Sequence, residues 1–317
     1  MAWAKGTSGR ILIDSETTYK SDPASPDGKI LPFVRESLVS KRNLIDSVTI
    51  TGDRNKKRPG QGNVDVSGDI EIELSETPYA TLMRHLLGSN ATTGASDPYT
   101  HTIKIGALPV GLVIENGFTD IAQYFKYNGC RVAGATFRFP KEGLCTATFR
   151  IMGAKETVGT SSYDATPTSM IHTPFSAFEA TILEGGSSIA TVTDVEFSID
   201  NDLDADGFTL GGAGERKYLP EGFAICTGTL TALFEDVALY TKAKNLTETS
   251  LKITVSHGTT PARSVEFLIP ELVYEQNAPA IEGPKGVTIK LPFRSYYDNS
   301  TEATSLQVII MNGLATI

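Results

Sequence analysis

A strict two-residue alternation in the stretch NVDVSGDIEIEL, residues 63–74, constrains this chain more than any other feature of its sequence. Apolar side chains fall on even-numbered positions, namely Val64, Val66, Ile70, Ile72 and Leu74. Acidic side chains fall on odd-numbered positions, namely Asp65, Asp69, Glu71 and Glu73. Because successive side chains of a β-strand point to opposite faces, the pattern predicts a strand with one buried face and one acidic face.

The segment just before this strand predicts a long hairpin. In DSVTITG, residues 46–52, Val48 and Ile50 alternate with threonines, and Pro59, Gly60 and Gly62 supply turn residues between the two strands. The hairpin tip is basic, although the formal net charge of the chain is -9. Its basic residues are Arg54, Lys56, Lys57 and Arg58.

A short helix and further strands follow. SETPYATLMRHLLGS, residues 75–89, predicts an amphipathic helix with Ser75 as its N-cap and Gly88 as its end. Strands are predicted in YTHTIKIG, GLVIENG, CRVAGATFRF and LCTATFRIMG, and the last two form a hairpin over PKEG.

The same order of elements recurs in the second half of the chain. A shift of 160 positions places Val66 on Cys226 and Gly68 on Gly228, and VALYTKAKNLTE then falls where the first helix is predicted. A shift of 144 positions places PKEGLCTATFR on PKGVTIKLPFR. We therefore predict a mostly-β fold of two tandem sandwich or barrel units, each with one short α-helix. The boundaries are an extended N-terminal arm at 1–30, a first unit at 31–155, a linker at 156–171 and a second unit at 172–317.

Several of these segments resemble the tail tube proteins of long-tailed bacteriophages. They include LPFVRESLVSKRNLIDSVTITGDRN, GNVDVSGDIEIELSETPYATLMRHLLGS and YNGCRVAGATFRFPKEGLCTATFRIMGAK, and the resemblance is continuous over the first half. It implies β-sandwich units that form rings, stacked into a hollow tube through which the genome passes. Most such proteins carry one unit and form hexameric rings. Two units in one chain imply a trimeric ring with six-fold pseudo-symmetry, unless the second unit decorates the outside of a hexamer.

The resemblance also implies partners and a location. The partners are further copies of the chain, a tape-measure protein, a tail tip and a tail terminator, with DNA only in non-specific transit through the lumen. The location is the virion tail, after assembly in the cytoplasm of a bacterial host.

Two groups of charged residues are candidates for this function. Asp65, Asp69, Glu71 and Glu73 are expected to face the lumen, where carboxylates repel DNA; the alternative is an ordinary solvated face. In the family the long hairpin contacts the neighbouring ring, so we expect the basic tip to dock on acidic surface there. The corresponding tip of the second unit is acidic and is also expected to contact the neighbouring ring; an ordinary solvated loop is the alternative for both. Its residues are Asp200, Asp202, Asp204 and Asp206.

Other classes of function find little support. No stretch of 18 apolar residues is present, so no membrane insertion is expected, and the acidic balance disfavours a protein that wraps DNA. Three scattered cysteines predict buried, reduced thiols. We expect no catalytic site, cofactor or metal: DLDADG, residues 202–207, begins like a calcium loop but has Ala213 at its twelfth position. His85 is expected to be a partly exposed surface residue. A carbohydrate- or receptor-binding β-sandwich adhesin is the alternative function, although the single tryptophan, Trp3, lies in the arm.

Overall fold

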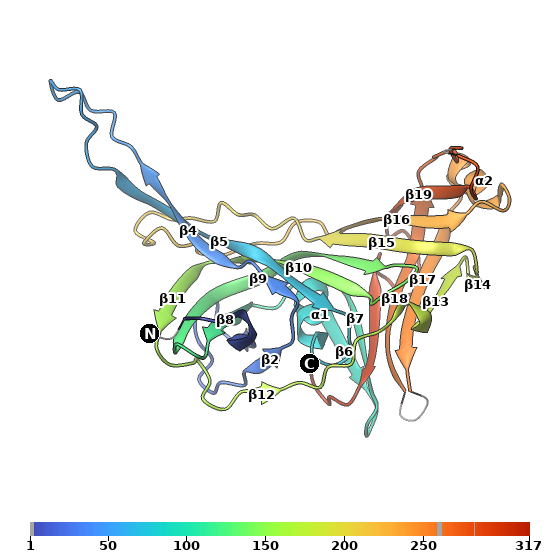
Figure 1. Ribbon diagram of the computed structural model, residues 1–317, viewed down its shortest axis with the longest axis horizontal. Coiled ribbons are helices and arrows are strands. Elements are labelled where there is room, and N and C mark those ends of the chain that lie inside the picture. The colour runs from blue at the N-terminus through green and yellow to red at the C-terminus, as the bar shows by residue number, and fades with distance from the viewer. Residues whose placement is uncertain (1–2, 259–261, 282) are drawn as a thin grey trace.

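The computed structural model describes residues 3–258, 262–281 and 283–317. Strands hold 49% of the residues and helices 7%, which confirms the predicted mostly-β fold. The two α-helices are α1 (Ala80–Leu87) and α2 (Ala238–Lys244), and short 3-10 turns occur at Gly6–Ser8 and Ala177–Glu179. Figure 1 shows an elongated molecule whose two strand-rich ends are joined by strands that run between them.

One antiparallel sheet, here called the main sheet, connects the two halves of the chain. From one edge to the other its strands are β3 (Arg35–Glu36) with β4 (Val39–Ile45), β5 (Gly60–Glu73), β10 (Thr146–Gly153), β9 (Gln123–Phe139), β15 (Val192–Asp200), β16 (Ile225–Leu233), β19 (Thr288–Ser295) and β18 (Arg263–Tyr274). The strands β9 and β15 come from different halves, and Phe137 lies opposite Phe197 where they meet.

A second layer covers the N-terminal half. β9 is 17 residues long, and its first part leaves the main sheet to pair with β8 (Gly111–Phe118) and β11 (Lys155–Gly159). The layer continues through β1 (Gly9–Glu16), β2 (Lys29–Leu31) and β12 (Thr168–Ser169). α1 packs against β9, so the helix closes the space between the two layers.

The C-terminal half has its own second layer. β18 pairs with β17 (Thr249–His257) and β20 (Gln307–Asn312), and β17 pairs with β13 (Ala180–Glu184), which forms a short hairpin with β14 (Ser187–Ser188). β20 then pairs with β7 (Tyr99–Ile105) of the N-terminal half, and β7 pairs with β6 (Gly88–Thr93). The halves are therefore joined at two places in the sheets.

Both halves also share one hydrophobic core. The ring of Phe137 lies 5.0 Å from that of Phe197 and 4.8 Å from that of Phe267, measured between centroids. Aromatic pairs at such spacings stabilise a fold beyond the apolar area that they bury. The linker predicted at 156–171 does not separate two cores, because β11 and β12 lie in this region and pair with strands of the N-terminal half.

The structure differs from the arm predicted at 1–30. Within this segment, β1 lies between β2 and β8, and Ile11, Leu12 and Ile13 are each at most 1% exposed. Burying three large aliphatic side chains contributes several kcal/mol, at about 1.5–3 kcal/mol each. Residues 9–16 are thus an internal strand of the fold.

The first helix also begins later than predicted. It starts at Ala80 without a side-chain cap, and the Ser75 hydroxyl donates instead to the neighbouring Glu76 carboxylate. Pro78 disfavours a helical conformation at Thr77, which delays the start. The predicted end at Gly88 is confirmed: its φ of 106° is a conformation that glycine tolerates and other residues rarely adopt.

Candidate functional site

The polar face of the main sheet, here called the outer face, is the first candidate surface. The acidic residues of β5 lie on it, since their apolar neighbours Val66, Ile70 and Ile72 point into the core. Three of the four carboxylates have a basic group nearby: Asp65 lies 2.5 Å from Arg216, Glu71 3.2 Å from Arg35, and Glu73 3.6 Å from His172. Within the described residues, Asp69 has no such partner.

Neighbouring strands place arginines on the same face. Arg150 of β10 lies 2.8 Å from Asp200 of β15, and Arg138 of β9 lies 2.9 Å from Glu196 of β15. Desolvation opposes ionisation of Asp200, but hydrogen bonds from Arg150 and the backbone of Asp202 outweigh it and lower its pKa. The outer face therefore carries acidic side chains on both β5 and β15, and most of them lie beside a basic group.

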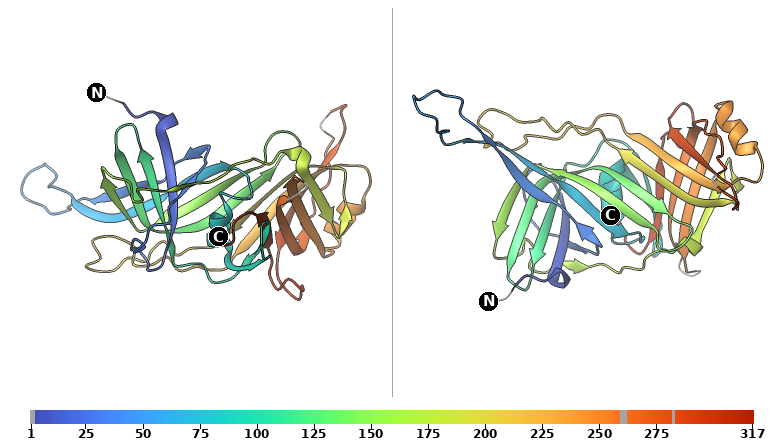
Figure 2. Two further views of the ribbon diagram at one scale, coloured as in Figure 1. Left: turned by 90° about the horizontal axis from the view of Figure 1, so that it is seen from below. Right: turned by 45° about the horizontal axis from the view of Figure 1, so that its top comes forward.

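The basic hairpin tip is the second candidate surface. Residues 46–59 project from the body of the molecule in every view of Figures 1 and 2. Lys56 pairs with Asp46 at 2.5 Å and Lys57 with Asp53 at 2.7 Å, both inside the hairpin. Arg54 and Arg58 make no ion pair with any residue that the structure describes. The tip thus presents two guanidinium groups without an internal counter-charge.

The prediction of a strand in DSVTITG is wrong. β4 ends at Ile45, and Val48 and Ile50 are each 93% exposed. An alternating pattern favours a strand only where a paired neighbour and a buried face exist, and residues 46–59 have neither in this chain.

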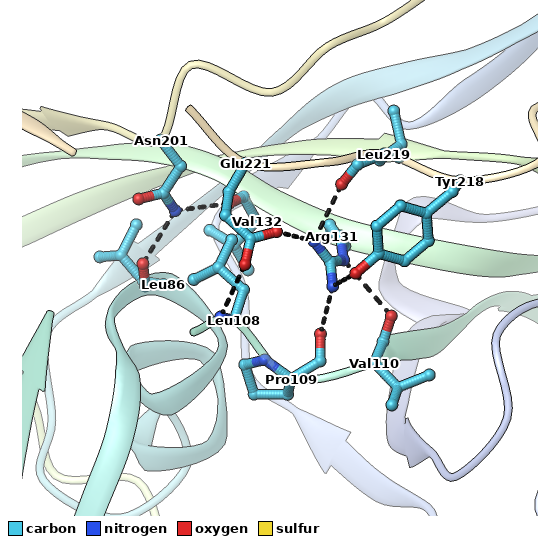
Figure 3. Close-up of polar contacts among 10 residues, drawn as sticks. All are labelled: Leu86, Leu108, Pro109, Val110, Arg131, Val132, Asn201, Tyr218, Leu219 and Glu221. Atoms are coloured by element: carbon cyan, nitrogen blue, oxygen red, sulfur yellow. Dashed lines mark hydrogen bonds and ion pairs between the residues drawn. The ribbon is translucent and has the colours of Figure 1, made fainter. Parts of the chain in front are cut away.

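The acidic tip of the C-terminal half is placed differently. Residues 201–224 fold back along the N-terminal half, and Figure 3 shows the contacts that hold them. Arg131 of β9 donates to the carbonyl oxygens of Pro109 and Leu219, to the Tyr218 hydroxyl and, at 2.5 Å, to the Glu221 carboxylate. Its side chain is 2% exposed, so these partners compensate the loss of water around the charge.

Two further side chains fix this segment. Asn201 donates to the carbonyl oxygens of Leu86 and Val132 at 2.8 and 3.0 Å, and Arg216 donates to that of Gly153 at 2.9 Å. The carboxylates of Asp200 and Asp204 accept hydrogen bonds from backbone N–H groups two residues later. Asp202, Asp204 and Asp206 are exposed. The basic tip projects, while the acidic tip lies against the body of the chain.

Residues singled out for chemistry have structural roles. His85 is 3% exposed and lies 3.0 Å from the Ser15 hydroxyl, so the expected surface position is wrong; α1 turns this face toward β1. The three cysteines are free and buried, as predicted. Within the described ranges, no group of three or more His, Cys, Asp or Glu side chains could hold a metal ion.

Neither helix in the described part of the chain has the length and apolar character needed to cross a membrane. No curated protein matches this sequence. A family model described as "Phage tail tube protein" matches residues 6–295, a range that runs from the 3-10 turn before β1 to the last residue of β19 and so includes both halves and their junction. The chain therefore belongs to the phage tail tube protein family, whose members are structural components of the virion tail.

Proposed function

We propose that this chain assembles into trimeric rings that stack into the hollow tail tube, and that DNA passes through the lumen. The family supports a role in tail structure; the proposal adds the ring, its stoichiometry and the transit of DNA. It also holds that the chain has no catalytic activity, needs no cofactor and assembles in the cytoplasm of the bacterial host.

The observation that carries the proposal is a repeated strand order. Across the main sheet, β4, β5, β10 and β9 are followed by β15, β16, β19 and β18, and the connection order along the chain is the same in both sets. A helix follows β5 in the first set and β16 in the second. Two copies of one unit placed side by side account for this order.

A pair of glycines supports the same duplication. A Cβ on Gly68 would lie 2.4 Å from the Ser37 carbonyl oxygen, and a Cβ on Gly228 would lie 2.6 Å from the Glu196 carbonyl oxygen. Ser37 and Glu196 precede Leu38 and Phe197, which lie opposite these glycines. Both halves thus need glycine at a point where two paired strands approach each other unusually closely.

The way in which the two units join within the chain supports ring closure. β9 of the first unit already pairs with β15 of the second, so a unit presents two different edges that fit each other. Repetition of a heterologous contact closes into a ring when the rotation per unit allows it, and closure leaves no open sheet edge. Three chains supply six units, with the outer face of the sheet turned to the lumen.

The basic tip is proposed to join successive rings. Its projection from the body and its unpaired Arg54 and Arg58 suit a contact with acidic surface of the next ring. Charged contacts of this kind set orientation and association rate more than affinity. The tape-measure protein, the tail tip and the tail terminator are the further partners that a tail tube requires.

Electron microscopy of the purified protein, combined with native mass spectrometry, tests this function. We expect rings or tubes and a smallest closed species of three times the 34.0 kDa chain mass. A ring of six chains would overturn the stoichiometry. A stable monomer at all concentrations would overturn tube assembly and favour the adhesin alternative.

A further inference from the structure

Two stretches of backbone at opposite ends of the main sheet have no strand beside them in the described part of the chain. One is the outer edge of β3 and β4, which pair only with β5. On this edge Leu38 is bonded within the chain: its N–H donates to the Glu36 carboxylate and its carbonyl oxygen accepts from the Tyr127 hydroxyl, so an added strand has to replace both partners. The other is the segment 275–280, which follows β18 and stays close to β19. Here the Glu275 N–H donates to the Pro292 carbonyl oxygen at 2.7 Å, and the Asn277 side chain donates to that of Lys290 at 2.9 Å. Free edges of this kind are templates for another strand.

The junction between β9 and β15 is a pattern for joining such edges. There Phe197 lies opposite Phe137, and Ile199 lies opposite Ala135. In the first unit Ser40 pairs with Val66, as Ile199 pairs with Cys226 in the second, and Glu36 pairs with Ile70 as Val195 pairs with Leu230. Residues 36–41 therefore correspond to 195–200.

The other edge can be matched by following the pairs across each unit. In the first unit Ile70 lies opposite Phe149, which lies opposite Ala135. In the second unit Leu230 lies opposite Leu291. Because Tyr274 lies opposite Phe293 and Glu275 bonds to Pro292, the next residue, Gln276, falls opposite Leu291. Gln276 therefore corresponds to Ala135.

We propose that residues 36–41 of one copy pair in antiparallel fashion with residues 275–280 of a second copy, with Ser40 opposite Gln276. This inference rests on the ring assembly proposed above and gives that ring its interface and register. The partner is another molecule of this chain, held by main-chain hydrogen bonds as β9 holds β15.

Charge complementarity supports this register. It places Lys41 opposite Glu275, and both side chains are exposed in the single chain. Glu275 already lies 2.9 Å from Arg294 of β19, so Lys41 would be a second basic partner of this carboxylate. At the internal junction Arg138 and Glu196 are opposite each other in the same way and form an ion pair at 2.9 Å. A shift of two residues would place Lys41 opposite Val273 and lose the contact.

The position of Pro279 is also compatible. Backbone N–H groups along a strand point alternately to either side, and that of Glu275 points to β19. β18 itself ends at Tyr274; if the same alternation continues past Glu275, position 279 shares this direction and the missing N–H of Pro279 lies on the β19 side. The N–H groups of Gln276, Ala278 and Ala280 then face outward, where the second copy would accept from them.

Disulfide cross-linking tests the register. The double variant Val39→Cys/Asn277→Cys brings two thiols opposite each other, within the Cα separation that a disulfide allows. The matched control, Asn43→Cys/Asn277→Cys, displaces one thiol by four residues, or about 13 Å along the strand. The native thiols do not compete, because all three are buried and burial raises the pKa of Cys145 and Cys226 to about 12.

After mild oxidation of assembled protein, a non-reducing gel should show covalent dimers and trimers of the first variant and only monomers of the control. Rings by microscopy with no cross-link in the first variant would overturn the register and leave the ring itself standing. Cross-linking of the control to the same extent would also overturn the register. Absence of rings in the wild-type protein would overturn the proposed function, and this inference with it.

Charge reversal gives a second test that needs no disulfide. On an Arg294→Gln background, which removes the partner of Glu275 within the chain, Lys41→Glu and Glu275→Lys should each slow assembly, followed by light scattering, by about tenfold, since each places like charges opposite each other. On that background the double variant should return to within about threefold of the rate of Arg294→Gln alone, because the pair is restored in reverse. A double variant as slow as the two single ones would contradict the pairing of Lys41 with Glu275.

Discussion

At the scale of single residues, His85 makes the stability of the fold dependent on pH. Burial lowers its pKa to about 3, so the ring is neutral in the folded chain, whereas an unfolded histidine titrates near 6.5. The unfolded state therefore binds more protons below pH 6.5, and stability falls as the pH drops from there toward 3. The neutral ring fits its place between α1 and the Ser15 hydroxyl.

We expect the free energy of unfolding to fall by about 2 kcal/mol between pH 7 and pH 5 through this residue alone. Urea unfolding at both pH values, on wild-type protein and on His85→Gln, measures this contribution as the difference between the two pH dependences. Equal pH dependences in the two proteins would contradict a buried neutral His85.

Arg131 is the second residue with a strong expected effect. Arg131→Met would remove the counter-charge of the Glu221 carboxylate and the donor to the Leu219 carbonyl oxygen, so we expect a loss of about 3 kcal/mol in urea unfolding. Proteolysis within 201–224 should become faster. Arg150→Met removes an ion pair to Asp200 whose partners are both about half exposed, and should cost under about 1 kcal/mol. Equal losses in the two variants would count against the role given to Arg131.

At the scale of secondary-structure elements, Gly68 and Gly228 allow the close approach of the strands to be tested in both halves. Gly68→Ala and Gly228→Ala each place a methyl group within 2.6 Å of backbone atoms, and overpacking of this kind should cost about 1–3 kcal/mol. Gly286→Ala is the control, because a Cβ there meets no atom within 4 Å. Thermal unfolding of the three variants gives the comparison. An unchanged melting temperature in Gly68→Ala or Gly228→Ala would argue against the close approach of the strands.

Elements with their own periodic pattern were predictable from the sequence. The alternation in β5 assigns its buried face correctly, and Gly88 marks the end of α1, because both signals depend on neighbours within the same segment. The strand β1 was not predictable as part of the fold. Its apolar run, Ile11 to Ile13, has no alternation, and only the presence of β8 and β2 on either side explains its burial.

The charges of the outer face show the same limit. The acidic row of β5 is visible in the sequence, but Arg150 and Arg138 join that face only because β10 lies beside β5 and β9 lies beside β10. Alternation within a strand tells which side chains share a face and not which strand is the lateral neighbour. For this reason the sequence did not predict the pairing of β9 with β15 or the contacts of Arg131.

At the scale of the whole molecule, the projecting tip should affect stacking and not ring formation. We expect Arg54→Glu/Arg58→Glu to give rings but few long tubes, because both charges that lack an internal partner are reversed. The control Lys5→Glu/Lys244→Glu changes the net charge by the same amount at exposed sites elsewhere. Tube length by electron microscopy, measured at several salt concentrations, separates the two. Unchanged tube lengths in the first variant would exclude the tip as a ring-to-ring contact.

The pairing of β9 with β15 inside one polypeptide also bears on how the proposed ring would assemble. Every second contact between units of that ring would be the β9–β15 pairing, which forms when a single chain folds. Because this contact is intramolecular, dilution does not weaken it. That internal seam contains Phe137 and Phe197, whose rings lie in the core that the two halves share. In the proposed ring the remaining seams meet solvent before they meet a partner. Leu38 and Ala278 would take the places of the two phenylalanines there, and the neighbouring Ser40, Gln276, Lys41 and Glu275 would keep this edge soluble until a second copy binds.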